Sequence, residues 1–106
     1  MIKHIILWTL KEQFTPNEKQ QIKQGIKDGL EGLAGQIPGL LSIHVYTEGL
    51  DTSTADLMLD SSFESTEALK AYAKHPAHLN VAEQMVRPYT ALRSCLDFEL
   101  QEGTSL

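Results

Sequence analysis

The stretch Ile2-Lys3-His4-Ile5-Ile6-Leu7-Trp8-Thr9-Leu10 decides how the fold is interpreted. It is rich in β-branched and other apolar side chains, which favours a β-strand. Successive side chains of a strand point to opposite faces, so the stretch presents two different sets to its surroundings. Because both sets are mainly apolar, we expect this strand to be buried on both sides. The two sets are His4, Ile6 and Trp8 on one face, and Ile5, Leu7 and Thr9 on the other.

A long helix follows this strand. Thr15, Pro16 and Glu18 form a helix start in which Thr15 and Glu18 make a capping box and the proline takes the first helical position. Apolar residues then recur every three or four positions and predict a helix that Pro38-Gly39 ends. This apolar stripe consists of Ile22, Ile26, Leu30, Leu33 and Ile37.

The same helix contains three glycines, Gly25, Gly29 and Gly32. Each one costs roughly 1 kcal/mol relative to alanine in a helix interior. Two interpretations account for them. Either the helix lies very close to its sheet, or it is loose enough to leave room for a pocket beside it.

The remaining elements alternate in a recognisable order. Ser65 caps a second long helix, which Pro76 stops because proline removes an amide donor and disfavours helical geometry in the residue before it. A shorter helix is expected from Pro76 to Val86, where Arg87-Pro88 breaks it. Turn residues at 49–54 separate the two middle strands. The predicted strands after the first are Leu40 to Tyr46, about Ala55 to Phe63, and Ala91 to Leu100.

The order β-α-β-β-α-β is that of the split βαβ, ferredoxin-like α+β fold, with a four-stranded antiparallel sheet. Its helices cover only one sheet face. Since the first and last strands are apolar on both faces, we expect a second copy of the chain to cover the open face. This predicts a homodimer, a dimeric α+β barrel. Residues 1–100 are predicted to form its single domain, and residues 101–106 a peripheral C-terminal tail.

Composition narrows the classes of partner. The chain has 106 residues and a formal net charge of −5, with its lysines and arginines scattered singly. Nucleic acids and anionic membranes require a concentrated basic face, so we expect neither as a partner. The single cysteine, Cys95, excludes an intramolecular disulfide. A reducing, cytoplasmic location is the simplest interpretation.

The segment 71–78 places a tyrosine and two histidines where a helix must stop, and His4 lies in the first strand. Histidine suits proton transfer near neutral pH, and a tyrosine hydroxyl can donate to a developing oxyanion. A structural interpretation competes at each position. His4 would be a buried, hydrogen-bonded strand residue, Tyr72 a core ring, and His75 a helix cap. His78, one turn inside the next helix, could point either way.

Four other polar residues invite a chemical interpretation. His44 is expected to face the dimer interior as a structural residue. Asp56 and Asp60 could form a carboxylate pair or a metal site, although a solvated strand edge is favoured. Cys95 is flanked at i−2 and i+2 by residues of opposite charge, for which a local ion pair between Arg93 and Asp97 is the simpler account. No metal, cofactor or phosphate-loop motif is recognised.

The chain resembles the Dabb family, the stress-responsive A/B barrel domains, over almost its whole length. The residues that carry this resemblance are the opening 2–8 stretch, Phe63-Glu64-Ser65, Tyr72 with His75-Pro76-Ala77-His78, Arg87-Pro88, and Asp97-Phe98. The family implies a dimeric α+β barrel.

Among family members, a plant polyketide (olivetolic acid) cyclase performs an intramolecular aldol condensation without a metal or organic cofactor. Its tyrosine and two histidines match Tyr72, His4 and His78, which are therefore the candidate catalytic residues. The chain departs from that enzyme at Lys23, Ile26 and the helix glycines, and Arg93 and Cys95 stand where more apolar residues are expected.

The resulting hypothesis is a small-molecule pocket between sheet and helices, in which these three residues perform cofactor-free acid/base chemistry on a small carbonyl compound. Two alternatives remain open. One is a non-catalytic stress-response or ligand-binding protein, and the other a cofactor-free monooxygenase-like barrel. The expected substrate-binding wall consists of Ile6, Trp8, Ile22, Ile26, Leu59 and Val81.

Overall fold

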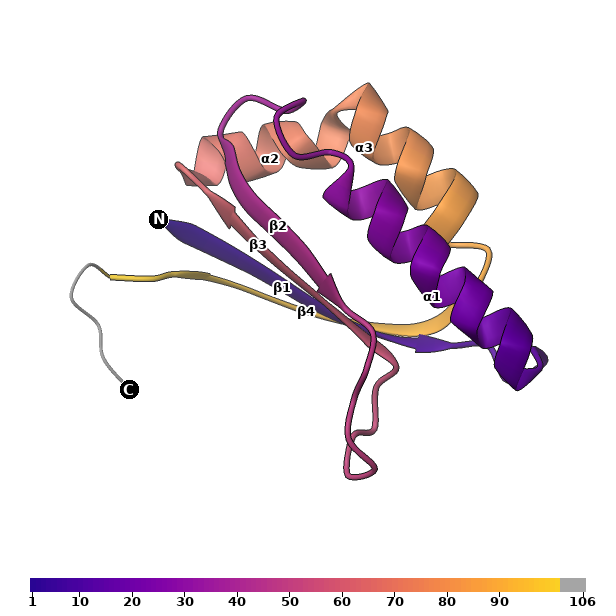
Figure 1. Ribbon diagram of the computed structural model, residues 1–106. Helices are drawn as coiled ribbons and strands as arrows, with labels where there is room; N and C mark the ends of the chain where they lie inside the picture. Colours follow the sequence, from indigo (N-terminus) through magenta and orange to yellow (C-terminus); the bar gives the residue numbers. More distant parts are fainter. Residues whose placement is uncertain (102–106) are drawn as a thin grey trace.

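The computed structural model describes residues 1–101 and places every helix on one side of a single sheet (Figure 1). Apart from Gln101, the predicted tail at 101–106 lies outside the described residues. The elements, in chain order, are β1 (Ile2–Leu10), α1 (Pro16–Glu31), β2 (Leu40–Tyr46), β3 (Leu57–Phe63), α2 (Thr66–Lys74), α3 (Pro76–Val81), the π-helical segment η1 (Ala82–Val86) and β4 (Thr90–Glu99).

The sheet has four strands in the order β2-β3-β1-β4, and all three neighbouring pairs are antiparallel. β1 therefore lies in the interior of the sheet, with Ile6 opposite Leu59 of β3 on one side and Cys95 of β4 on the other. The order of elements and the coverage of one face confirm the predicted ferredoxin-like fold. The third strand begins at Leu57, two residues later than expected.

The core lies between the inner sheet face and the helices. Alternate residues of β1 are buried there, whereas the residues between them face away from the helices and are only partly covered. Burial of large apolar side chains is the main favourable term for a domain of this size. The largest fully buried side chains include Tyr72, Phe63, Leu10, Ile26, Leu30, Leu59 and Val45.

The first helix is shorter than its apolar stripe suggested. Its start carries the predicted capping box between Thr15 and Glu18, but the helix ends at Glu31 and not at Pro38-Gly39. Consecutive turns then carry Leu33 and Ile37, which are buried all the same. A hydrophobic spacing of three or four continues through such turns, so the stripe alone overestimates the helix.

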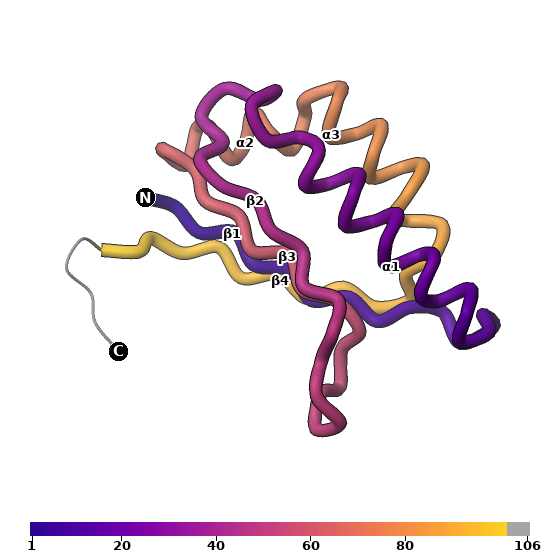
Figure 2. Tube along the Cα trace, in the orientation of Figure 1, coloured from indigo at the N-terminus to yellow at the C-terminus, as the bar shows by residue number. Residues whose placement is uncertain are grey.

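Two of the three glycines, Gly25 and Gly29, are explained by contact with other helices, whereas Gly32 is the C-cap that follows α1. A Cβ atom on Gly29 would lie 3.0 Å from a methyl of Val81 and 3.6 Å from Met85, while one on Gly25 would lie 3.8 Å from the Met85 sulfur. Figure 2 shows α1 running beside the α3–η1 segment. The glycines thus bring α1 close to its neighbouring helices, an arrangement that neither of the two sequence interpretations included.

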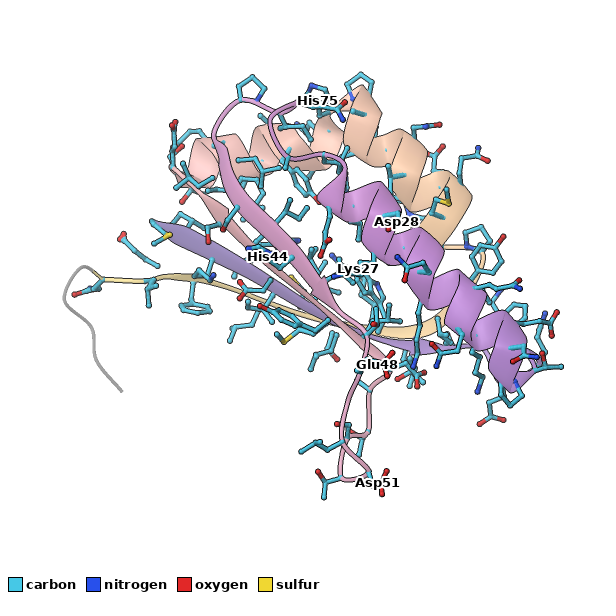
Figure 3. All side chains as sticks on the ribbon, viewed as in Figure 1. Lys27, Asp28, His44, Glu48, Asp51 and His75 are labelled. Carbon is cyan, nitrogen blue, oxygen red and sulfur yellow. The ribbon has the colours of Figure 1, made fainter. Side chains whose placement is uncertain are left out.

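Two side chains of α1 cover the backbone of the edge strand β2. Lys27 donates from Nζ to the Val45 carbonyl at 2.9 Å, and the Glu31 carboxylate accepts the Val45 amide at 2.9 Å. Lys27 and Glu31 also bond each other at 2.8 Å. Figure 3 shows Lys27 on the side of α1 nearest the strands. An edge strand otherwise exposes unpaired backbone groups that invite strand addition, and these bonds occupy part of that edge.

The segment after Pro76 begins where the proline predicted and changes its hydrogen-bonding pattern after one and a half turns. Residues 76–81 are α-helical, and residues 82–86 are π-helical, with the Arg87 amide bonded to the Ala82 carbonyl at 2.9 Å. The expected single helix over residues 76–86 is therefore two kinds of helix in sequence. π segments of this kind occur frequently at functional sites.

The sheet face opposite the helices carries large apolar side chains that are exposed. Leu96 is 63% exposed and Tyr46 is 54% exposed. The register places Ile5 beside Leu96, and Leu7 beside Met58. Apolar patches of this type mark association sites in soluble proteins. The exposed apolar residues on this face of the four strands are Leu7, Tyr46, Leu92, Leu96 and Phe98.

The glycine contacts lead to a paired stability prediction. Gly25→Ala should raise the free energy of unfolding by about 0.5–1 kcal/mol, since alanine is the better helix former and its methyl makes an ordinary contact with Met85. Gly29→Ala should give a smaller gain or a loss, because Val81 must move to admit the methyl. Urea unfolding of both variants measures the difference. Equal gains would contradict the close packing at Gly29.

Candidate functional site

A cavity of about 350 Å³ lies between the sheet and the helix layer. Every described element except β2 contributes a side chain to it. The strands β1, β3 and β4 form its floor, and α1, α2, α3 and η1 form its roof. Most of the lining is apolar. The lining residues are His4, Ile6, Trp8, Leu30, Leu59, Leu69, Tyr72, Ala73, His78, Ala82, Val86, Arg87, Thr90 and Arg93.

The structure brings the three predicted polar residues to this one cavity. His4 projects from the inner face of β1, Tyr72 from the last turns of α2, and His78 from the first turn of α3. The ring centroids of Tyr72 and His78 are 4.2 Å apart, and those of His4 and Tyr72 are 6.2 Å apart. Tyr72 and His78 follow His4 in the sequence by 68 and 74 positions, and the fold brings all three to the same cavity.

The junction between α2 and α3 explains how Tyr72 and His78 come to face each other. His75 ends α2 and caps α3, its Nδ1 accepting a hydrogen bond from the Ala77 amide at 3.1 Å. This confirms the predicted capping role, and Figure 3 shows His75 at the junction, away from the strands. The extended backbone at His75 lets the chain change direction before Pro76 restarts the helix.

Two polar atoms of cavity-lining residues are buried without a hydrogen-bond partner among the described residues. They are the hydroxyl oxygen of Tyr72 and Nδ1 of His78. Tyr72 itself is only 1% exposed. Leaving a buried polar group unpaired costs on the order of 1–3 kcal/mol, so such atoms in native proteins call for an explanation. Here both atoms belong to residues that line the same cavity.

Burial fixes the protonation states of this pair. It raises the pKa of the Tyr72 hydroxyl well above its ordinary value, although the nearby Arg93 guanidinium acts in the opposite direction, so the phenol stays protonated near neutral pH. Burial also lowers the pKa of His78 below 6.5, although the nearby Ala73 backbone opposes the change. His78 is therefore neutral at pH 7. The pair consists of one hydrogen-bond donor and one proton acceptor.

His4 is held by a residue that the sequence interpretation assigned elsewhere. Its Nδ1 bonds the carboxylate of Asp97, which lies opposite it in the β1–β4 register. The expected ion pair between Arg93 and Asp97 is therefore wrong. A carboxylate on Nδ1 fixes the orientation of an imidazole and leaves its other nitrogen for a partner. The predicted fold pairs the first strand with the last, and this pairing was the signal from which a contact between His4 and Asp97 could have been expected.

Cys95 lies beside this pair and is not activated. Its sulfur is 3.8 Å from His4 Nδ1 and 3.5 Å from the Asp97 carboxylate. Burial and the neighbouring Asp97 raise the pKa of the thiol, which disfavours the nucleophilic thiolate. The donor atoms of His4, Cys95 and Asp97 lie within 4.8 Å of one another. The direct His4–Asp97 bond already occupies two of these three groups.

Half of the predicted wall lines the cavity. Ile6, Trp8 and Leu59 do so, whereas Ile22, Ile26 and Val81 are not among the lining residues. Ile26 is buried in the core, Ile22 lines a separate groove beside Tyr89 on the other side of α1, and Val81 packs against Gly29. The apolar stripe of α1 could not distinguish contacts with the cavity from contacts with the core. The walls that sequence reasoning missed come mainly from α2, η1 and the start of β4.

The remaining polar candidates lie outside the cavity. The Asp56 carboxylate accepts the Leu10 amide at 2.8 Å, and Asp60 pairs with Lys3 at 2.5 Å. Asp60 lies on β3, inside the sheet, so the solvated edge expected for the two aspartates is wrong for Asp60, while Asp56 precedes that strand. His44 is exposed and lies opposite Asp60 in the β2–β3 register, on the open sheet face. These residues take no part in the site.

The arrangement defines a class of protein: a ferredoxin-like α+β domain whose sheet and helices enclose a mainly apolar, ligand-sized cavity with a few polar groups. The chain belongs to the stress responsive A/B barrel domain family, Dabb, whose model matches residues 2–100. No helix within residues 1–101 is long and apolar enough to cross a bilayer.

Three relatives illustrate the range of this fold. The stress-response A/B barrel domain-containing protein HS1 of Arabidopsis thaliana is 26% identical over 87 residues, which are 76% of this chain and 73% of that protein. A dimeric ferredoxin-like protein of unknown function from Bacteroides fragilis has a TM-score of 0.87 and 27% identity, covering 93% of this chain and 95% of that one. A hydroxynitrile lyase from Passiflora edulis shares the fold at a TM-score of 0.71 and 16% identity, covering 98% and 96%.

The state of His78 makes stability depend on pH. Because its pKa is lowered in the folded protein, the unfolded chain binds this proton more readily, and stability falls as pH drops through 6.5. Urea unfolding at about pH 7.5 and about pH 5.5 measures this effect. Between the higher and the lower pH, the unchanged protein should lose more free energy of unfolding than the His78→Asn variant. An equal loss in both proteins would show that His78 is not held neutral.

Proposed function

We propose that the protein is a cofactor-free acid/base catalyst that acts on a small carbonyl compound in the cavity between sheet and helices. One observation carries this proposal. The Tyr72 hydroxyl and His78 Nδ1 are buried and unpartnered within the described chain, and they belong to two neighbouring rings that line the cavity. A carbonyl compound with an acidic C–H bond offers one group for each of them.

The chemistry follows from the protonation states of the pair. Neutral His78 accepts a proton from the carbon beside the carbonyl, and the electrons of the broken C–H bond move to the carbonyl oxygen. The Tyr72 hydroxyl donates a hydrogen bond to the resulting enolate oxygen. The enolate carbon then takes a proton back or attacks a second carbonyl group, which forms a C–C bond as in an aldol reaction. In this proposal His4, whose Nδ1 is bonded to Asp97, exchanges a proton with that second oxygen.

The apolar wall contributes to this chemistry through its low polarity. Ile6, Trp8 and Leu59 are each less than 5% exposed, so water is largely excluded from the floor of the site. Hydrogen bonds and charges act more strongly in such surroundings than in water. An oxyanion formed beside Tyr72 therefore gains more from one donor than it would in solution.

The first step can be followed without knowing the natural substrate. In heavy water, the protein should catalyse exchange of the C3 hydrogens of 2-oxohexanoate and of its methyl ester for deuterium, measured by proton NMR. His78→Asn should abolish the catalysed exchange, and Tyr72→Phe should reduce it by roughly 10²-fold, as expected for loss of an oxyanion donor. The rate should rise with pH and level off around or below 6.5, because His78 must be neutral.

Two matched controls keep this experiment specific. His75→Asn removes the neighbouring histidine but retains a good helix cap. Tyr89→Phe removes a hydroxyl outside the cavity, where the ring packs against Phe14. Both controls should exchange at the rate of the unchanged protein. Exchange that survives His78→Asn, or that fails equally in the controls, would contradict the assignment. Binding with no exchange at all would favour the non-catalytic alternative.

We also propose that the protein is a homodimer whose two open sheet faces meet. The apolar side chains of that face have no cover among the described residues, and the Bacteroides fragilis relative is a dimer. The loop between β2 and β3 extends past the sheet on the side away from the helices, with Asp51 at its tip (Figure 3). Beside it, a groove of about 350 Å³ lined by Leu7, Tyr46 and Met58 offers space for a partner's side chains.

Sedimentation tests the dimer directly. The unchanged protein should sediment as a dimer at micromolar concentration, and Leu96→Glu should yield monomers, because it places a charge in the centre of the apolar contact. Asn80→Glu adds the same charge on the exposed side of α3 and should leave the dimer intact. A monomer for the unchanged protein, or a dimer that Leu96→Glu does not weaken, would rule out this interface.

A further inference from the structure

The mouth of the cavity is marked by the lining residues that are exposed, namely Ala73, Arg87 and Arg93. Arg93 lies on the inner face of β4, opposite Trp8 in the β1–β4 register. It lines both the cavity and an adjoining groove of about 680 Å³ between α2 and β4. A ligand that enters from this groove passes the guanidinium before it reaches Tyr72 and His78.

Arg93 is the cation that lines both the cavity and the groove, and it forms no ion pair within residues 1–101. Arg87 pairs with Glu83 at 3.7 Å, and Asp97, the acidic residue nearest in the strand, is engaged by His4. No carboxylate within residues 1–101 forms an ion pair with Arg93. Arg93 lacks an ion-pair partner although the chain has 14 acidic residues and only nine lysines and arginines. A guanidinium has donors in a fixed fork that match a carboxylate.

The charge of Arg93 is also felt inside the cavity. It acts to lower the pKa of the Tyr72 hydroxyl and of His78, which places it within electrostatic reach of both. A positive charge at this position favours negative charge that develops on a bound molecule. The site therefore offers an anion-binding end at Arg93 and a reacting end at Tyr72 and His78, with Trp8 and Leu59 along the apolar part.

We infer that the ligand is a small keto acid or related carbonyl compound, and that the Arg93 guanidinium binds its carboxylate at the cavity mouth. The inference rests on the proposed function for the reacting end and adds the substrate class. In the expected pose the carboxylate lies at Arg93, the carbonyl oxygen at the Tyr72 hydroxyl, and the hydrocarbon part against the apolar floor. Arg93 is a binding residue and exchanges no proton.

Trp8 provides a direct measurement of binding. It is the single tryptophan of the chain and lines the cavity at 4% exposure, so its fluorescence reports a molecule in that space. Titration with 2-oxohexanoate and with its neutral methyl ester compares two probes that differ mainly in charge. The acid should bind at least about tenfold more tightly than the ester, as expected for hydrogen bonds to a charged group.

Variants assign the difference to one side chain. Arg93→Gln should weaken binding of the acid by at least about tenfold and leave the ester unchanged, and Arg93→Lys should recover only part of the affinity, since lysine lacks the fork. Lys74→Gln removes one exposed positive charge elsewhere on the helix layer and should change neither probe. Added salt should weaken binding of the acid more than binding of the ester.

The results separate this inference from the proposed catalysis. If the acid binds no more tightly than the ester, including the case in which neither binds, or if Arg93→Gln leaves the preference intact, the inference is overturned. If the ester binds as tightly as the acid and its hydrogens exchange at the same rate, the inference is overturned, while the acid/base proposal stands. Selective binding of the acid without exchange would support Arg93 and contradict the catalytic proposal.

Discussion

The pairing of β1 with both β3 and β4 is the constraint on which the rest of the structure depends. A strand paired on both edges and apolar on both faces must lie inside the sheet. Its inner residues then form the floor of the core, and the register with β4 brings Asp97 to His4 and Arg93 to Trp8. The two pairings of β1 thus fix the strand order of the sheet, and the pairing with β4 orients His4 and places Arg93 at the mouth of the cavity.

The second determinant of the site is the break between α2 and α3. An uninterrupted helix would place Tyr72 and His78 six residues apart on its surface, and side chains at that spacing do not face each other. The break at His75 and Pro76 changes the direction of the chain, and the two rings meet with their centroids 4.2 Å apart. The same local features that end one helix therefore assemble the reactive pair.

Sequence reasoning succeeded where a signal was local or periodic. The cap at Thr15, the stop at Pro76 and the strand at residues 2–10 each predicted what the structure shows. It failed where the outcome depended on distant partners. The end of α1 was missed because buried turns continue an apolar spacing, and the partner of Asp97 was misassigned because His4 is 93 residues away.

The walls of the cavity illustrate the same limit in a different way. An apolar residue on a helix stripe packs equally well against a sheet, another helix or an empty volume, so Ile22, Ile26 and Val81 could not be separated from Leu30 by periodicity. The polar candidates were selected in another way, because the resemblance to the Dabb family points to His4, Tyr72 and His78. Their chemistry still depends on burial, which the sequence does not display.

The bonds from Lys27 and Glu31 to Val45 have a consequence for how large an assembly can grow. A sheet has two edges, and a copy-to-copy chain of hydrogen-bonded strands needs both of them to continue. In this protein the β2 edge is covered at Val45 by side chains of α1, whereas no such bonds cover the β4 edge within residues 1–101. Growth from a single open edge stops once two copies meet. A lysine and a glutamate outside the cavity lining thus hinder the strand addition that fibre growth would require at the β2 edge.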